Sequence, residues 1–170
     1  MKYNPVSIKD KVIFITGALG QIGTEISTSF LRQKAKVILT DLNLNKKEYL
    51  EKKFIDLDIT SNNYLFIKLD ITKEEDCKRA VKLATEKYGK IDVLVNNAAI
   101  DAKFDNEGTS KVNKSRFEFY PIEALKKSVE VNLIGTVMIT QVVCRQMLIQ
   151  KSGNIINVAS TYSIVAPNQS

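Results

Sequence analysis

Short apolar runs alternate with amphipathic stretches along most of the chain. Continuous runs of apolar and β-branched residues are typical of strands buried on both faces, whereas apolar residues three or four positions apart are typical of helices. In the first part of the chain this pattern predicts strands at 11–16, 36–41, 64–70 and 91–99, and helices at 21–33, 45–54 and 72–89.

The alternation continues after one interruption. A polar stretch at 101–121 has no clear periodicity and predicts a long loop over a cleft. Residues 122–150 are apolar on one face and predict a long helix, and residues 153–160 predict a fifth strand.

Two features mark the ends of the helix predicted at 72–89. Thr72, with Glu75 three residues later, predicts a capping box at its start. Gly89 predicts a left-handed stop at its end.

The order of the elements indicates the fold class. Strands alternating with helices favour right-handed βαβ units and a parallel sheet covered by helices on both faces. No linker rich in Pro, Gly or Ser divides the chain. We therefore predict an α/β fold with a doubly wound, Rossmann-like parallel sheet, and a single domain over residues 1–170.

The composition is that of an ordinary globular protein, with 44% hydrophobic and 26% charged residues. The longest apolar runs have the length of strands, below the roughly 20 residues of a membrane span. The opening residues lack the features of a signal peptide. Cys77 and Cys144 fit a reducing compartment and lack metal-ligand spacing. We expect a cytoplasmic protein without a membrane partner or a metal site.

The charged residues narrow the possible chemistry. The chain has no histidine, so proton transfer must use Ser, Tyr, Lys, Asp or Glu. Its formal net charge is +6, but most lysines stand beside acidic residues at helical spacing, as on a solvated helix face. No basic stripe with interleaved aromatic residues is present, so nucleic-acid binding is the weakest of the functions considered.

A glycine-rich turn, "TGALGQIG", links the first predicted strand to the first helix. Gly17 permits a tight turn, Gly20 lets the backbone approach a pyrophosphate, and Gly23 lets the helix pack closely on the strand. The free N–H groups at the start of the helix would then face an anion. A turn needs glycine in any case, so the motif gains weight only from its place between the first strand and the first helix.

A carboxylate ends the second predicted strand. Asp41 lies 18 residues past Gly23, where it can accept both hydroxyls of an adenosine ribose and would repel a 2′-phosphate. The alternative is an ordinary turn aspartate at a strand end. No basic residue stands in the glycine turn or directly after Asp41, and this pattern favours NAD over NADP.

Several motifs occur together in a specific order. As a set they resemble the short-chain dehydrogenase/reductase family over nearly the whole chain: Thr16 and Gly17 with Gly20 and Gly23, Asp70, "NNAA" at 96–99, Asn132 in "VEVNLIGT", and "GNIINVAS", which ends at Ser160. The resemblance implies the strand order 3-2-1-4-5, and it makes the single domain an NAD-binding one.

The resemblance also implies roles for individual residues. Thr16 and the helix start at Gln21 and Ile22 belong to the cofactor site. Asp70 would bind the adenine amino group with Ile71 beside the ring, and Asn97, Ala98 and Ala99 would line the adenosine and ribose region. Asn132 would hold a water in a proton relay, and Ser160 would polarise the substrate oxygen. The alternatives are a helix-entry turn for Asp70 and an asparagine bonded to backbone for Asn132.

Two departures from the family pattern concern the cofactor side. The single-domain branch has a glycine at position 21, whereas this chain has Gln21 and places the glycine at Gly20. This spacing resembles the branch that modifies nucleotide sugars. The usual "NNAG" is "NNAA", so Ala99 narrows the space near the ribose. Neither change removes the dinucleotide site, and together with "NNAAIDAKF" they resemble dehydrogenases of bacterial surface-sugar pathways, such as flagellin modification.

A third departure concerns catalysis. The family's base is a tyrosine about a dozen residues past the serine, followed four residues later by a lysine that lowers its pKa. Tyr162 follows Ser160 by only two residues, and four residues later stands Ala166. We therefore expect a fragment of a longer enzyme, without the last strands of the sheet and inactive by itself. The resemblance also implies a homo-oligomer.

The leading interpretation is an NAD-dependent oxidoreductase that transfers a hydride between nicotinamide and a carbonyl or secondary alcohol substrate, which could be a sugar derivative. The alternative is a non-catalytic dinucleotide-binding module that senses NAD or serves as a scaffold. A Tyr-x-x-x-Lys motif downstream in the reading frame would favour the enzyme.

Overall fold

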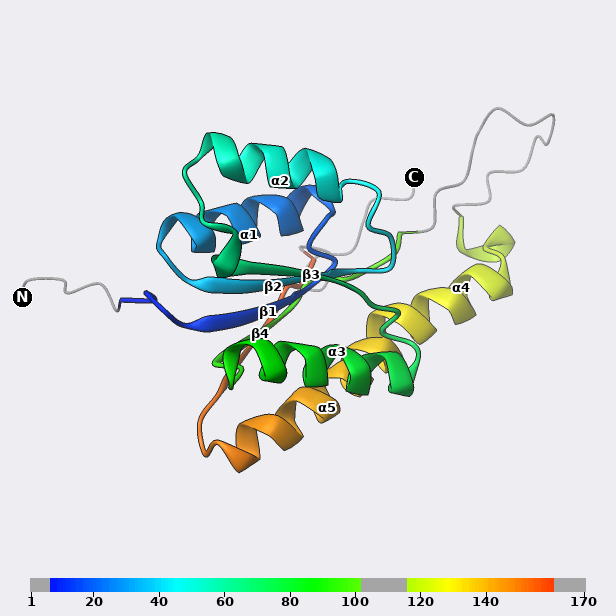
Figure 1. Cartoon of the computed structure of the whole chain (residues 1–170). Helices are drawn as coiled ribbons and strands as arrows, with labels where there is room; N and C mark the ends of the chain where they lie inside the picture. The colour runs from blue at the N-terminus through cyan, green and yellow to red at the C-terminus, as the bar shows by residue number, and fades with distance from the viewer. Residues whose placement is uncertain (1–6, 102–115, 161–170) are drawn as a thin grey trace, which may run out of the picture.

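The computed structural model describes residues 7–101 and 116–160. Its centre is a five-stranded parallel sheet in the order β3-β2-β1-β4-β5 (Figure 1). The strands are β1 (Val12–Thr16), β2 (Lys36–Asp41), β3 (Tyr64–Lys68), β4 (Val93–Asn96) and β5 (Asn154–Asn157). The predicted doubly wound sheet and its strand order are confirmed.

The central position of β1 creates the switch point of the fold. β1 pairs with β2 from Val12↔Lys36 onward, and on its other side with β4 from Ile13↔Val93 onward. The chain therefore winds in one direction from β1 to β3 and in the other direction from β4 to β5. In an open parallel sheet, ligands bind where the winding direction reverses, beyond the carboxyl ends of the strands.

Helices cover both faces of the sheet. α1 (Gln21–Arg32) and α2 (Lys47–Asp56) lie on one face, and α3 (Glu74–Tyr88) and α5 (Thr136–Ile149) lie on the other (Figure 1). α4 (Ile122–Val129) precedes α5 and projects past the sheet.

Each face of the sheet has its own apolar core, because successive strand residues point to opposite sides. Ile13 and Ile15 of β1 join the core under α1 and α2, whereas Val12 and Phe14 join the core under α3 and α5. Complete burial of such a side chain contributes about 1.5–3 kcal/mol.

The start of α3 differs from the prediction. Lys73 precedes the helix without a side-chain cap, and the Thr72 hydroxyl donates instead to Asp70 Oδ1 at 2.6 Å. The predicted capping box is therefore wrong, because the preceding turn uses the threonine. The predicted stop is confirmed: Gly89 is left-handed with φ of 76°, and its N–H donates to Thr85 O at 2.7 Å.

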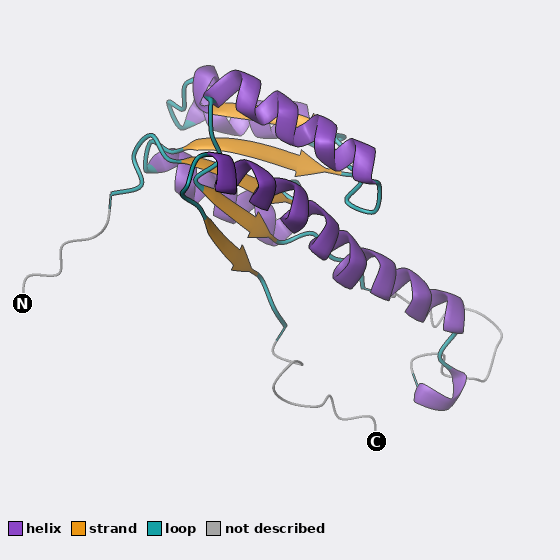
Figure 2. Ribbon diagram, turned by 90° about the horizontal axis from the view of Figure 1, so that it is seen from below, coloured by secondary structure: helices purple, strands orange, loops and turns teal. Residues whose placement is uncertain are grey.

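The long helix predicted at 122–150 is present but irregular. Residues Glu130–Gly135 form a π-helical segment between α4 and α5. Gly135 allows this segment to approach the loop after β3, because a Cβ at this position would lie 2.8 Å from Ile71 Cγ1. Figure 2 shows that α4 extends beyond the carboxyl ends of the strands.

The same helix is longer than the strand-length apolar runs on which the sequence analysis based its expectation of no membrane span. Ile122–Ile149 is long and apolar enough to cross a membrane by length and composition alone. In the fold, however, one side of α5 packs into the core through Ile139, Val143 and Met147. A core helix of a globular domain meets the same criteria, so the length carries little weight.

β5 is shorter than the strand predicted at 153–160. It pairs with β4 from Val93↔Asn154 to Asn96↔Asn157, and one further backbone bond runs from Val158 N–H to Asn96 O at 2.9 Å. The predicted loop at 101–121 is described only at its ends, where Phe117–Phe119 forms a 3-10 turn. Tyr162 and Ala166 lie outside the described residues.

Candidate functional site

A cleft with a volume of about 1060 Å³ opens at the carboxyl ends of the strands. Its wall combines the glycine turn after β1, the loops after β2, β3 and β4, and one side of the long helix. All predicted cofactor-site residues except Thr16 line it: Gly17, Gly20, Gln21, Ile22, Gly23, Asp41, Asp70, Ile71, Asn97, Ala98 and Ala99.

Two glycines of the turn have no room for a side chain. Gly17 is left-handed with φ of 62°, and a Cβ there would lie 2.8 Å from Ala98 Cα. A Cβ on Gly23 would lie 2.2 Å from Gly17 O and 2.9 Å from Asn97 Nδ2. The requirement at Gly23 thus comes from the turn itself and from Asn97. Gly20 is less constrained, since the nearest atom would be 3.4 Å away.

Thr16 supports the site from below. Its side chain is buried, and its hydroxyl oxygen accepts the backbone N–H groups of Asn97 at 3.1 Å and Ala98 at 3.0 Å. The hydroxyl also donates to Val95 O at 3.4 Å. Thr16 therefore joins the ends of β1 and β4 and does not face the cleft.

The side chain of Asn97 completes this connection. Its Nδ2 donates to Thr16 O at 3.1 Å and to Gly17 O at 2.9 Å. The amide thus holds the glycine turn in place, and the residue reaches the cleft beside Ala98 and Ala99. Sequence reasoning assigned Asn97 to the cleft but did not identify this bracing role.

The start of α1 is suited to an anion. Gly20 precedes the helix in an extended conformation, and the helix start has no side-chain cap and no acidic residue in its first turn. The first N–H groups of a helix lack partners within it and carry a partial positive charge. These groups open into the cleft beside Gln21 and Ile22.

Asp41 is the last residue of β2 and lies beside the glycine turn. Its Oδ2 accepts the Leu19 N–H at 3.0 Å, and its Oδ1 accepts the Asn43 N–H at 3.3 Å. These bonds fix the carboxylate against the glycine turn. A carboxylate oxygen has two lone pairs, so both oxygens retain acceptor capacity for a ligand.

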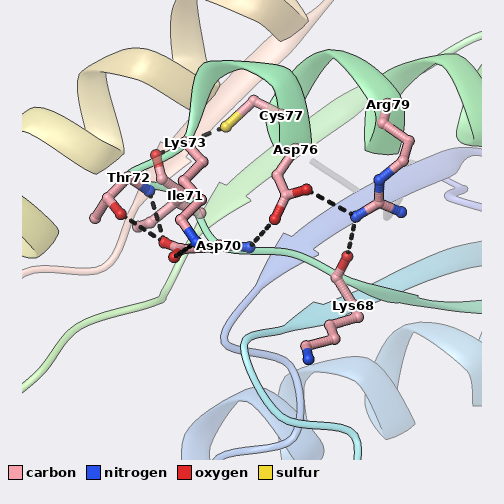
Figure 3. Close-up of polar contacts among 8 residues, drawn as sticks. All are labelled: Lys68, Asp70, Ile71, Thr72, Lys73, Asp76, Cys77 and Arg79. Carbon is pink, nitrogen blue, oxygen red and sulfur yellow. Dashed lines mark hydrogen bonds and ion pairs between the residues drawn. The ribbon is translucent and has the colours of Figure 1, made fainter.

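Asp70 begins a tight polar turn after β3 (Figure 3). Its Oδ1 accepts the Thr72 hydroxyl at 2.6 Å and the Thr72 N–H at 3.0 Å, and Lys73 Nζ lies 3.6 Å from Oδ2. Burial alone would raise the pKa of Asp70, but the Thr72 bonds and Lys73 outweigh it and lower the pKa. Asp70 is therefore an ionised acceptor at the cleft, and it also forms the helix-entry turn named as its alternative.

Asn132 projects from the π-helical segment to the loop after β4. Its Oδ1 accepts the Ile100 N–H at 2.8 Å, and its Nδ2 donates to Ile100 O at 2.9 Å. Asn132 is therefore bonded to backbone, as in the alternative given for it from the sequence, and its side chain is exposed. An asparagine amide has a second N–H and a second lone pair, so these bonds leave capacity for a water. Asn132 itself does not line the cleft, whereas Ile100 does.

Ser160 lies three residues beyond β5, at the same end of the sheet, and is exposed. It is not among the residues that line the cleft. The described structure therefore gathers the cofactor-side residues, but it does not bring Ser160 into the same cleft.

Sequence analysis did not assign several other cleft residues to the site. They include Leu19, Thr40, Asn43, Lys46, Thr72 and Lys127. Their position in the sequence could have identified most of them, because they follow the carboxyl end of a parallel strand, where ligand sites form.

Comparisons with known proteins agree with this geometry. The model of the short chain dehydrogenase family matches residues 11–169. The NAD-dependent glycerol dehydrogenase of Listeria innocua is 31% identical over 160 residues, which cover 94% of this chain and 56% of that enzyme. The mitochondrial borneol dehydrogenase of Lavandula x intermedia is 33% identical over 159 residues, which cover 94% of this chain and 55% of that enzyme.

A solved structure supports the same relationship. NAD⁺-bound xylitol dehydrogenase superposes with a TM-score of 0.81 at 26% identity, covering 94% of this chain and 56% of that one. The chain thus spans less than two thirds of the length of these relatives.

Proposed function

This chain belongs to the short chain dehydrogenase family, and we propose on that premise that it is the cofactor-binding part of an NAD-dependent oxidoreductase. Such an enzyme transfers a hydride between nicotinamide and a secondary alcohol or carbonyl carbon. The observation that carries the proposal is the cleft at the switch point, where the glycine turn, Asp41 and Asp70 meet.

The residues of the cleft fit a dinucleotide. A Cβ on Gly17 or Gly23 would collide with Ala98 Cα or Gly17 O, so these glycines let the turn pack tightly beside the cleft. The uncapped start of α1 favours a negatively charged pyrophosphate. The ionised Asp70 can accept a hydrogen bond from an amino group, as adenine offers. Asp41 can accept from ribose hydroxyls. When bound, NAD would supply the hydride acceptor, and the protein would supply position and electrostatics.

The cofactor preference is the first test. We expect the protein to bind NAD at least about tenfold more tightly than NADP, or about 1.4 kcal/mol, because Asp41 would repel a 2′-phosphate. Asp41→Ala should remove most of this preference. Both cofactors can be titrated calorimetrically into wild type and variant. Equal affinities in wild type, or an unchanged preference in Asp41→Ala, would contradict the assignment.

Ser160 is proposed to polarise the reacting oxygen, and Asn132 to hold a relay water through its remaining amide capacity. If Ser160 donates to the oxygen in the transition state, Ser160→Ala should lower kcat by roughly two to three orders of magnitude. The affinity for NAD should stay unchanged. The assay requires the product of the full reading frame, and a near-normal kcat would reduce Ser160 to a residue of the strand end.

The substrate class is an alcohol or carbonyl compound. The relatives named above are dehydrogenases of glycerol, borneol and xylitol, so a panel of polyols, sugar derivatives and simple secondary alcohols is the appropriate screen. We further propose a homo-oligomer in the cytoplasm, without nucleic acid or membrane as partner. The apolar side of the long helix supports self-association, because Leu133, Ile134 and Val137 are about half exposed.

The alternative, a non-catalytic dinucleotide-binding module, is favoured by one observation: the described residues do not place Ser160 in the cleft. Formation of NADH by the product of the full reading frame separates the two. Turnover with any alcohol of the panel supports the enzyme, and NAD binding without turnover supports the module.

A further inference from the structure

Lys46 lies at the rim of the cleft, next to the carboxylate that sets the cofactor preference. Lys46 Nζ donates to Leu19 O at 3.4 Å, and the Leu19 N–H donates to Asp41 Oδ2 at 3.0 Å. The ammonium group and the carboxylate are thus tied to the two polar groups of one residue in the glycine turn. All three residues line the cleft.

The charge of Lys46 is not neutralised by a neighbouring side chain. Lys47 pairs with Glu51 at 3.8 Å, and Lys53 pairs with Glu25 at 2.9 Å. In the part of the chain that the structure describes, no carboxylate lies within 4.0 Å of Lys46 Nζ. An ammonium group has three N–H donors, and the contact with Leu19 uses one. Lys46 can therefore offer a positive charge and two donors to a ligand in the cleft.

The other lysine of the cleft occupies a different wall. Lys127 belongs to α4, whereas Lys46 is bonded to the turn that also holds Asp41. Lys46 is therefore the cation placed to act on the same part of a ligand as Asp41.

We propose that Lys46 is a second determinant of cofactor choice, which opposes Asp41 by attracting the 2′-phosphate of NADP. The proposal rests on the proposed function, in which the cleft binds a dinucleotide with its adenosine ribose at Asp41. It implies that the preference for NAD is smaller than Asp41 alone would produce. A lysine five residues past the carboxylate thus moderates the selectivity.

Calorimetric titration of NAD and NADP into wild type and Lys46→Ala tests the proposal. We expect Lys46→Ala to raise the Kd for NADP about tenfold, equivalent to about 1.4 kcal/mol, and to leave the Kd for NAD within about twofold. The change should shrink between roughly 0.02 M and 0.5 M salt, because a charge at the rim is screened. The same comparison in an Asp41→Ala background makes the NADP affinity easier to measure.

Three further variants make the result specific. Lys47→Ala removes the neighbouring lysine, which is paired with Glu51 and does not line the cleft, and should leave both affinities unchanged. Lys46→Arg keeps the charge and should keep the affinity for NADP. Lys46→Gln keeps most of the side-chain volume, and it replaces Lys46→Ala if that variant does not fold.

The outcomes distinguish failure of the role proposed for Lys46 from failure of the proposed dinucleotide site. A Kd for NADP that is unchanged, or that rises together with the Kd for NAD, overturns the role of Lys46 while the dinucleotide site stands. If the folded wild type binds neither cofactor at millimolar concentration, the proposed function itself fails and the inference fails with it. A selective loss of NADP affinity supports both.

Discussion

At the scale of single residues, the glycine turn shows that positions of one motif carry unequal constraints. Gly17 and Gly23 have no space for a Cβ, whereas Gly20 would meet only Gly17 O at 3.4 Å. Gly20 also has an ordinary extended backbone, with φ of −70°. Neither the space around position 20 nor its backbone conformation therefore requires a glycine.

This difference predicts the outcome of two matched substitutions. Gly23→Ala should lower the free energy of unfolding by about 1–3 kcal/mol, as overpacking of a rigid site does, and weaken NAD binding. Gly20→Ala should lower it by less than about 1 kcal/mol, since its contact is close to an ordinary van der Waals distance. Thermal unfolding monitored by circular dichroism checks both. Equal losses in the two variants would contradict the geometry.

Residue types at strand ends were predictable from sequence, but their partners were not. The spacing of Asp41 from Gly23 placed it at the cleft, since both follow strands of one parallel sheet. Lys46 was missed because the sequence analysis considered basic residues only in the glycine turn and directly after Asp41. Lys46 lies five residues past Asp41, and its side chain contacts the turn at Leu19 O. The bracing role of Asn97 needed the close approach of β4 to Gly17.

At the scale of elements, Asp92 joins the amino ends of β1 and β4, opposite the cleft. Its Oδ2 accepts the Val12 N–H at 2.8 Å and lies 2.9 Å from Lys90 Nζ, and its Oδ1 lies 3.5 Å from Lys11 Nζ. Burial alone would raise the pKa of Asp92, but the Val12 hydrogen bond and the two lysines outweigh it and lower the pKa.

The lowered pKa gives a pH dependence of defined sign. A carboxylate whose folded pKa lies below its unfolded value stabilises the fold above the unfolded pKa of about 3.9, and this stabilisation is lost as the pH falls through the folded pKa. Asp92→Asn should therefore reduce the free energy of unfolding by about 1–3 kcal/mol at pH 7.

The difference between wild type and Asp92→Asn should shrink as the pH falls below about 4. Urea unfolding at several pH values measures it, and Asp56→Asn on the exposed side of α2 is the control, with little change expected. A difference that stays constant down to pH 2 would show that Asp92 acts through packing and not through its charge.

Strands and helices with a regular spacing of apolar residues were predictable from the sequence, whereas local irregularities were not. Five strands and the long helices follow from apolar runs and helical spacing, with ends displaced by a few residues. The capping box failed because Thr72 has a better partner in Asp70. The hydrophobic pattern did not predict the π-helical segment or the close approach of Gly135 to Ile71.

At the scale of the whole molecule, the described residues place a cleft suited to a dinucleotide and an exposed apolar surface on the same framework. The cleft lies where the winding reverses, and the apolar surface lies on the long helix that also forms one wall of the cleft. The homo-oligomer stays a prediction. The catalytic base was not predictable from these residues, because Tyr162 and Ala166 do not match the family's spacing of tyrosine and lysine.

The other functional proposals depend on the binding of NAD in the cleft between the glycine turn, Asp41 and Asp70. Titration of NAD into the ¹⁵N-labelled protein, followed by amide chemical shifts, tests it most directly. We expect saturable changes centred on residues 17–23, Asp41, 70–72 and 97–101, with little change at 90–92 at the opposite end of the sheet. Absence of saturable changes, or changes centred on the apolar side of α5, would contradict it.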